Sequence, residues 1–385
     1  MIRKVVSPRP DWQQQAEAAG FIFHHVDGDI YWDESVCYSF TLRQIEVDIE
    51  DATQELVAMC LDAVAEAVQS EEILTKLAIP DFAWDMVRNS WKEGDATIYG
   101  RFDFAYDGQN PTKMYEYNAD TPTSLYESAY FQWLWLEDAR ETGIVRPDAD
   151  QFNSIQETLI ETFSSFNIAA PMHFSCVTGS DEDLATVHYL RDCAEQAGIS
   201  TRHIYIEDIG IDGGGQFVDM DDQPIRHLFK LYPWEFMVRD TFAPHLPKCD
   251  TQFFEPPWKM ILSNKGILPL LWERYPNHPN LLPAWFHDPA KRAPYGDYVL
   301  KPIFSREGAN IRAFRDHEEK LATPGSYGAE GYIGQLLCPP PYIDGNGPVI
   351  GSWVINNTAC GMGIREDDGP ITGNLSRFVP HVIEG

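Results

Sequence analysis

The feature that most constrains this chain is a pair of alternating segments, residues 96–106 and 113–118, joined by the hexapeptide DGQNPT. Both segments are rich in aromatic residues, and polar side chains recur at every second position at 101–103 and 116–118, which is typical of strands. A connection rich in Gly, Asn and Pro between two such runs predicts an antiparallel hairpin. The hairpin then has one polar face and one apolar face.

Residues two apart on a strand share a face of the sheet. On the second strand, Met114, Glu116 and Asn118 are therefore expected on one face, with Tyr115 and Tyr117 on the other. An acid and an amide side by side on a strand flanked by aromatic residues need a chemical explanation.

One register of this hairpin gathers four polar groups. It pairs Asp103 with Glu116, Arg101 with Asn118, and Ala105 with Met114. Two carboxylates and an amide oxygen form a hard, oxygen-rich site that suits Mg²⁺, and the arginine beside them would stabilise charge on a transferring phosphoryl group. The alternative is an exposed sheet face that carries an ion cluster.

The composition narrows the classes of partner. The chain has 385 residues, 44% of them hydrophobic, with 11 tryptophans, which is enough for a substantial core. Its formal charge of −30 disfavours binding to nucleic acid and to anionic membranes. The charge is compatible with a cationic substrate such as a polyamine, and the alternative is that it serves only to keep the protein soluble. Seven scattered cysteines without a C-x-x-C pair, and no apolar leader, favour a reducing, cytoplasmic location.

The remaining pattern is mixed α and β without a clear linker. Thr41 and Gln44 form a capping-box start for a helix over 41–68. Residues 172–210 predict a βαβ unit, with a glycine C-cap ending its helix and a further strand at 225–234. Other helices are expected at 124–141, 154–166 and around 258–275, and strands at 298–310, 331–337 and 348–367.

Five later features could belong to a nucleotide site. Lys265 and Lys301 lie among apolar residues, and each is either a snorkelling surface lysine or a fixed charge in a cleft. SREGAN (305–310) is a polar loop whose backbone can bind a phosphate. GYIGQLL (331–337) is either an adenine-side strand or a core strand, and Arg365 is either a site residue or part of a surface ion pair.

Together these segments resemble the synthetase part of the glutathionylspermidine synthase family, and most closely its stand-alone acid–amine ligases. The motifs that carry the resemblance run in order along nearly the whole chain: RFDF, YEYNADTPTSLYE, FQWLW, KLYPWE, SNKGILPLLW, HPNLLPA, KPIFSREGAN and GSWVIN. The resemblance implies a permuted ATP-grasp-like fold with an inserted βαβ subdomain. In this arrangement the acids precede the lysines, whereas usual ATP-grasp enzymes have the reverse order.

The resemblance also implies a role for each matching position. The magnesium ligands would be Asp103, Glu116 and Asn118, with two ions expected, and Arg101 would be catalytic. ATP would be bound by Arg101, Asp103, Lys265, Lys301, Gly308, Gln335 and Arg365. The chain would form one synthetase unit, 1–385, with the metal-binding hairpin in 1–150, an α/β substrate-side part in 151–250 and the ATP-binding lysines, loop and hinge in 251–385.

The implied reaction is carboxylate–amine ligation, in which ATP converts a carboxylate to an acyl phosphate and an amine then displaces phosphate. It needs no enzyme nucleophile, and no Ser–His or Cys–His signature is present. The acid would be a peptide such as glutathione and the amine a polyamine or an amino acid. The segment TPTS stands where the bifunctional relatives have a serine-rich segment, so Thr121 is a candidate substrate contact and glutathione as the acid is in question.

Two other functions remain open from the sequence. One is a nucleotide-binding protein that has lost ligation and acts as a sensor or assembly partner. The other is a phosphotransferase that stops at a phosphorylated substrate. The chain begins directly in the synthetase part, so the amidase domain of the bifunctional relatives, and hydrolysis of the product, are not expected.

Overall fold

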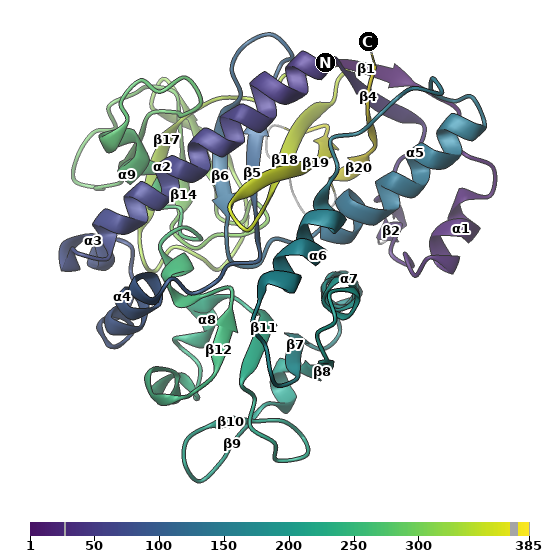
Figure 1. Ribbon diagram of the computed structural model, residues 1–385. Helices are drawn as coiled ribbons and strands as arrows, with labels where there is room; N and C mark the ends of the chain where they lie inside the picture. The colour runs from purple at the N-terminus through teal and green to yellow at the C-terminus, as the bar shows by residue number, and fades with distance from the viewer. Residues whose placement is uncertain (27, 370–375, 385) are drawn as a thin grey trace.

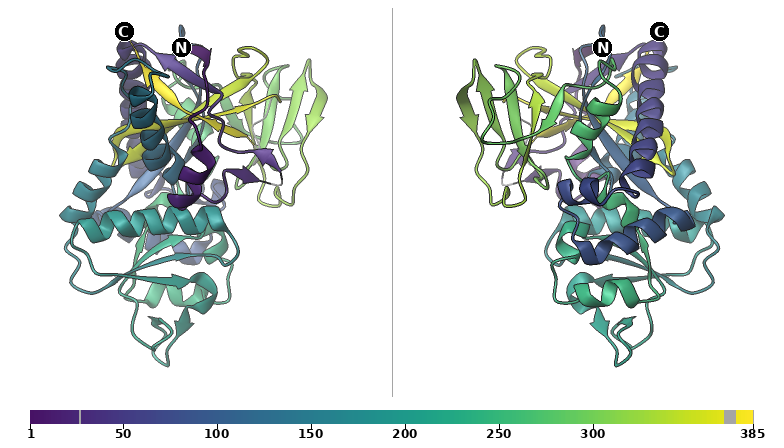
Figure 2. Two further views of the ribbon diagram at one scale, coloured as in Figure 1. Left: turned by 90° about the vertical axis from the view of Figure 1, so that its right-hand side faces the viewer. Right: turned by 90° about the vertical axis from the view of Figure 1, so that its left-hand side faces the viewer.

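Two five-stranded antiparallel sheets, a four-stranded parallel sheet and a three-stranded sheet organise the computed structural model, which describes residues 1–26, 28–369 and 376–384 (Figure 1). Helices cover the sheets, so the expected mixed α and β class is confirmed. The two antiparallel sheets lie side by side above the parallel sheet (Figure 2).

The central antiparallel sheet has the strand order β20-β19-β18-β5-β6. Its strands are β5 (Tyr99–Ala105), β6 (Lys113–Asn118), β18 (Gly347–Ile355), β19 (Thr358–Asp367) and β20 (Arg377–Val379). On β5 the alternation holds: Phe102 and Phe104 belong to one apolar core, whereas Arg101 and Asp103 face the other side. The expected hairpin is therefore present, and its polar face is turned inward.

One face of the central sheet is covered by the expected N-terminal helix. The capping box is present, since the Gln44 backbone N–H donates to Thr41 Oγ1 (3.3 Å) and the Thr41 N–H donates to Gln44 Oε1 (3.0 Å). The helix starts as a wider π-helical stretch, η1 (Gln44–Asp51), and continues as α2 (Ala52–Ala67). Its apolar side packs on the face that carries Phe102.

The second antiparallel sheet supplies the other wall of the cavity described below. Its order is β13-β17-β14-β15-β16. The strands are β13 (Ala284–Phe286), β14 (Tyr298–Pro302), β15 (Arg312–Arg315), β16 (Glu318–Ala322) and β17 (Tyr332–Leu336). Lys301 lies on β14, opposite Ile333, and Gln335 lies on β17, opposite Val299, so one sheet carries both residues.

The predicted βαβ unit is present in the parallel sheet, whose order is β12-β11-β7-β8. It consists of β7 (Met172–Cys176), α7 (Asp181–Gln196) and β8 (Thr201–Tyr205). The Ser180 hydroxyl accepts from the Asp183 N–H and starts the helix. The sheet continues through β11 (His227–Leu231), the expected further strand, to β12 (Gln252–Phe254).

Shorter elements complete the described chain. The helices are α1 (Trp12–Ala18), α3 (Glu71–Lys76), α4 (Trp84–Glu93), η3 (Glu127–Phe131), α5 (Gln132–Glu141), α6 (Ile155–Ser165), α8 (Trp234–Met237) and α9 (Ile267–Arg274). The strands are β1 (Ile2–Val5), β2 (His25–Val26), β3 (Asp29–Ile30), β4 (Val36–Phe40), β9 (Gly210–Ile211), β10 (Phe217–Val218) and β21 (His381–Ile383). Short 3-10 turns lie at Asp81–Ala83, Ile206–Asp208, Ala243–Lys248 and Pro257–Met260.

The helical prediction around 258–275 is right only in its second half. Residues 257–260 form a single 3-10 turn after Pro256, and α9 begins only at Ile267. Between them the Asn264 side-chain oxygen accepts from the Gly266 N–H, which offers the backbone an alternative to the helical bond. None of the helices in the described ranges is long and apolar enough to cross a membrane.

Candidate active site

A cavity of about 220 Å³ lies between the polar face of the central sheet, the second sheet and the start of α7. Every residue that the sequence singled out lines it: Arg101, Asp103, Glu116, Asn118, Thr121, Lys265, Lys301, Gly308, Gln335 and Arg365. These positions span more than 260 residues of chain, and the fold brings all of them together.

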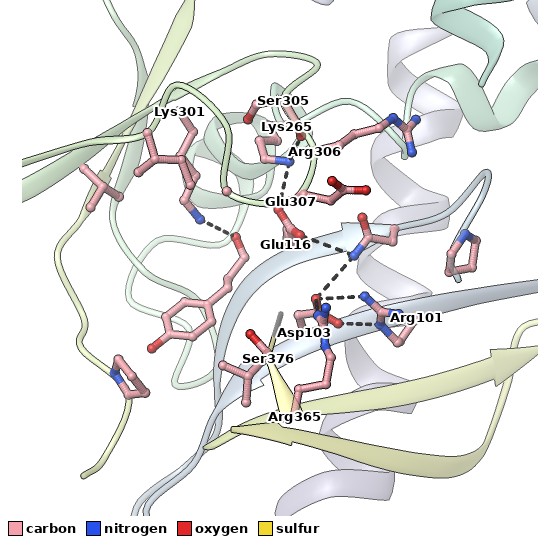
Figure 3. A pocket seen from close by; sticks show the side chains of 18 of the residues that line it. Arg101, Asp103, Glu116, Lys265, Lys301, Ser305, Arg306, Glu307, Arg365 and Ser376 are labelled. Carbon is pink, nitrogen blue, oxygen red and sulfur yellow. Dashed lines mark hydrogen bonds and ion pairs between the residues drawn. The ribbon is translucent and has the colours of Figure 1, made fainter. Parts of the chain in front are cut away.

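The hairpin forms the floor of the cavity in the expected register near its polar pairs. Asp103 lies opposite Glu116, and Arg101 lies opposite Asn118. Arg101 donates from Nε to Asp103 Oδ1 (2.7 Å) and from Nη2 to Oδ2 (3.1 Å), and Arg365 Nη2 reaches the same Oδ2 at 2.9 Å (Figure 3). Both oxygens of this buried carboxylate are thus held by guanidinium groups.

The third expected pair is wrong, because the register shifts directly after Asp103. Phe104 lies opposite Met114, and Ala105 lies opposite Lys113, so Tyr115 is an extra residue on β6. Such a bulge reverses the facing of the residues beyond it. Met114 therefore packs in the core, and Tyr115 lines the cavity, the opposite of the alternation expected from the sequence.

Three different groups fix the position of the Arg101 side chain. Besides its two bonds to Asp103, it donates from Nη1 to the Thr123 carbonyl (2.7 Å), and its Cζ lies 5.6 Å from the centre of the Trp353 ring. Burial lowers the pKa of Arg101, but the nearby carboxylates, Asp103 first among them, together outweigh burial and the pKa is raised. The guanidinium is thus a permanent charge in a defined position.

Glu116 and the two lysines form the next layer of charge. Lys265 Nζ lies 2.8 Å from Glu116 Oε2 and also donates to the Ser305 carbonyl (2.6 Å), while Lys301 Nζ donates to the Tyr115 carbonyl (3.1 Å). Burial alone would raise the pKa of Glu116, but the charges of Lys265 and Lys301 hold it well below its usual range. Burial, aided by Lys265 and opposed by Glu116, lowers the pKa of Lys301 to about 8.

The donor set fits a magnesium ion without a third acid. Asn118 Nδ2 lies 3.4 Å from Asp103 Oδ2 and 3.3 Å from Glu116 Oε1. One N–H₂ group therefore lies between the two carboxylates, where a cation could bind to both of them. No group of three or more His, Cys, Asp or Glu side chains suited to a metal occurs in the described ranges. Mg²⁺ usually needs only one or two carboxylates, with the rest of its shell supplied by water and substrate phosphates.

The SREGAN loop closes one side of the cavity and is tied down by Arg306. Its Nε and Nη2 donate to Glu235 Oε1 at 3.0 and 2.7 Å, and its Nη1 donates to Thr121 Oγ1 at 2.8 Å. Gly308 has a φ of +69°, a conformation that glycine adopts without strain. Thr121 therefore lines the cavity as expected, but its hydroxyl is engaged by the loop.

The two ends of the cavity differ in character. The end between β14, β15 and β17 is apolar, lined by Val299, Ile311, Ala313, Leu321, Leu336 and Val349. There the Gln335 side chain donates to the Met114 carbonyl (3.1 Å), so its amide is fixed. Side chains of this kind suit the flat faces of an aromatic ring.

The opposite end is acidic and was not identified from the sequence. It is lined by Glu182, in the first turn of α7, by Glu307 of the loop and by Ser124 and Tyr31. Ser124 Oγ lies 3.4 Å from Glu182 Oε1. Sequence reasoning also missed Arg306, although it lies inside the loop that was singled out. Nothing in the local pattern around Tyr31 or Glu182 indicates that they approach a site.

The chain has clear relatives. Residues 3–384 match the family described as glutathionylspermidine synthase preATP-grasp. A protein of Haemophilus influenzae named "Putative acid--amine ligase" is 43% identical over 387 residues, which cover 97% of each chain. Trypanothione synthetase of Crithidia fasciculata is 30% identical over 344 residues, and the bifunctional glutathionylspermidine synthetase/amidase of Escherichia coli is 25% identical over 401 residues.

The latter two relatives are longer than this chain. The matched region covers 52% of the trypanothione synthetase and 63% of the bifunctional enzyme, but 83% and 97% of this chain. Among solved structures, a glutathione synthetase-like effector from Globodera pallida aligns over 98% of both chains with a TM-score of 0.55 and 12% identity. That likeness shows a shared synthetase-like fold.

Proposed function

The chain belongs to the glutathionylspermidine synthase family of ligases, and on that premise we propose that it joins a carboxylic acid to an amine through an acyl phosphate, using ATP and Mg²⁺. The observation that carries the proposal is the charge arrangement in one cavity. Arg101, Arg365, Lys265 and Lys301 surround the two carboxylates of the hairpin, next to an apolar slot. Phosphoryl transfer depends on positioning and charge neutralisation, which such an arrangement supplies.

The four cationic side chains would bind different reactants, some the nucleotide and others the acid. Lys265 and Lys301, with the backbone of the loop at Gly308, would bind phosphate oxygens, while the base would lie in the apolar slot beside Gln335. Arg101 would orient the reacting carboxylate and neutralise the charge that develops on the transferring group. Its fixed position beside Asp103 and Trp353 means that little reorganisation is needed.

Asp103, Glu116 and Asn118 would hold Mg²⁺, which supplies neutralisation of phosphate charge when bound. In the present arrangement Lys265 pairs with Glu116, and Arg365 pairs with Asp103. These cations are placed to move from the carboxylates to phosphate oxygens when ATP and metal enter together. This exchange of partners keeps every buried charge compensated. We also propose that two Mg²⁺ ions bind.

The acidic end would bind the amine. Glu182 and Glu307 line it, so an ammonium group would find two carboxylates there. The names of relatives point to glutathione as the acid and to spermidine as the amine, and these are the first substrates to test. We also propose the permuted ATP-grasp arrangement, with the hairpin ligands ahead of the lysines, and the βαβ unit as the substrate-side part.

A substrate screen by mass spectrometry tests this function. The protein would be incubated with ATP, Mg²⁺, glutathione or other peptides, and polyamines or amino acids, while ADP and products are measured. Ligation predicts ADP that depends on both acid and amine, with a product lighter than the two substrates by one water. ADP that forms equally without amine would mean a phosphotransferase, and ATP binding without turnover would mean a sensor or assembly partner.

A further inference from the structure

Tyr31 and Glu127 form a buried pair at the acidic end of the cavity. Tyr31 directly follows β3 and lines the cavity, and Glu127 begins η3 behind it. The Tyr31 hydroxyl donates to Glu127 Oε1 at 2.7 Å, and both residues are buried. The tyrosine therefore connects the cavity to a carboxylate that does not itself line it.

The second oxygen of Glu127 makes this carboxylate unusual. In the described ranges, Oε2 is buried and has no hydrogen-bond partner. A buried carboxylate with an unsatisfied oxygen binds a proton more tightly than a solvated one. Burial, and next the charge of Glu182, raise the pKa of Glu127 to about 8, against the lowering effects of the Tyr31 hydrogen bond and of Arg101.

The proposed ligation needs a proton acceptor at this end. An alkylamine is an ammonium ion at neutral pH and must lose a proton before its nitrogen can attack a carbonyl carbon. Glu182 lines the cavity directly and suits the role of counter-ion, because it stays exposed to the bound cation. Glu127 is set behind Tyr31, where a proton can be stored away from that cation.

We propose that Tyr31 passes a proton from the attacking ammonium group to Glu127, an inference that rests on the ligase function proposed above. The ammonium gives a proton to Tyr31 Oη as the phenolic proton moves to Glu127 Oε1, which leaves a neutral amine. The amine nitrogen then forms the C–N bond, the bond from carbon to the phosphate oxygen breaks, and phosphate leaves. The second proton on nitrogen goes to the departing phosphate.

Hydroxylamine separates this proton step from carboxylate activation, because it is neutral at neutral pH and attacks acyl phosphates without a base. With glutathione, ATP and Mg²⁺, we would measure the amide from spermidine and the hydroxamate from hydroxylamine. Glu127→Gln and Tyr31→Phe should lower amide formation by about 100-fold or more and leave hydroxamate formation within about two-fold of wild type. Amide formation by the wild type should rise through about pH 8 and level off above it, whereas in Glu127→Gln it should follow the free-amine fraction and keep rising at higher pH.

A matched control is available in Tyr38→Phe. Tyr38 is also buried and donates to a buried carboxylate, Glu366 Oε2 at 2.8 Å, but neither residue lines the cavity. This variant should keep both activities. Melting temperatures of all variants identify any that fail to fold, and Tyr31→Phe keeps the packed ring if Glu127→Gln is unstable.

Each result decides the matter. Equal loss of amide and hydroxamate in both folded variants would overturn the proposal, since Glu127 would then serve carboxylate activation. Unchanged amide formation would overturn it as well. Selective loss in Glu182→Gln, without selective loss in Glu127→Gln, would make Glu182 the acceptor. If the wild type forms neither product with glutathione or other peptides, the ligase function itself is wrong, and the proton transfer falls with it.

Discussion

Gly351 on β18 lies opposite Asp103, directly beneath the Arg101 side chain. A Cβ at this position would lie 2.8 Å from Arg101 Cδ, 3.2 Å from Nε and 3.4 Å from Cγ. The contact with Cδ is closer than carbon atoms tolerate. Gly351→Ala therefore forces either the arginine or the strand to move.

The arginine has little room to move, because it is bonded to Asp103 and to the Thr123 carbonyl and lies over Trp353. Overpacking of this kind costs about 1–3 kcal/mol of stability. If Arg101 shifts away from the reacting carboxylate, the loss should resemble that of one charge-stabilising donor, about 100- to 1,000-fold in kcat. A one-methyl change outside the cavity lining would then act on activity more than on folding.

The assay is steady-state ADP release with the substrates found in the screen, together with a thermal melt. Gly213→Ala is the matched control, because a Cβ there would meet nothing within 4 Å. It should change neither quantity. If Gly351→Ala folds and retains kcat within about two-fold of wild type, the fixed position of Arg101 is not required and this reasoning is refuted.

Four further predictions concern charged and titratable side chains. Glu116→Gln should lower Mg²⁺-dependent turnover by about 100-fold or more with the melting temperature nearly unchanged. If Glu116 served only in a surface ion pair, the substitution would cost under about 1 kcal/mol and spare activity. Arg306→Lys should weaken ATP binding, measured by calorimetry, because a lysine cannot make both the two hydrogen bonds to Glu235 and the one to Thr121. Unchanged affinity would mean that these hydrogen bonds are not needed to hold the loop for ATP binding. Burial and Glu182 raise the pKa of Glu127 to about 8 from 4.5, so between these two pH values the folded state binds a proton that the unfolded state has lost. The free energy of unfolding therefore falls as the pH rises from 4.5 to about 8. Thermal melts of Glu127→Gln should show a weaker fall than those of the wild type. Burial lowers the pKa of His381 to about 3 from 6.5. The free energy of unfolding should therefore fall as the pH drops from 6.5 to about 3, by at most about 1.4 kcal/mol per pH unit. A melting temperature that does not change over this pH range would contradict a neutral, buried His381.

Local patterns in the sequence predict most elements of the fold. The capping box of Thr41 and Gln44 starts a helix, alternation produces the hairpin, and the βαβ unit follows from its succession of patterns. These are near-neighbour effects, decided by backbone hydrogen bonds and by which side chains can share a face. Family motifs add the candidate residues, and all ten line one cavity.

The bulge at Tyr115 shows where local reasoning stops. Perfect alternation would place Met114 toward the cavity and Tyr115 in the core, but the packing of Met114 beside Phe104 outweighs regular pairing. The energy of such a choice comes from contacts with distant elements, which no window of the sequence contains.

By itself, then, the sequence determined most of the secondary elements, the polar face of the hairpin and the set of candidate residues for binding a metal and a nucleotide. Tertiary structure alone decided which charges meet: Arg365 with Asp103, Lys265 with Glu116, and Tyr31 with Glu127. The physical reason is that pairing of buried charges depends on distance and burial, and both arise only when separate elements pack together.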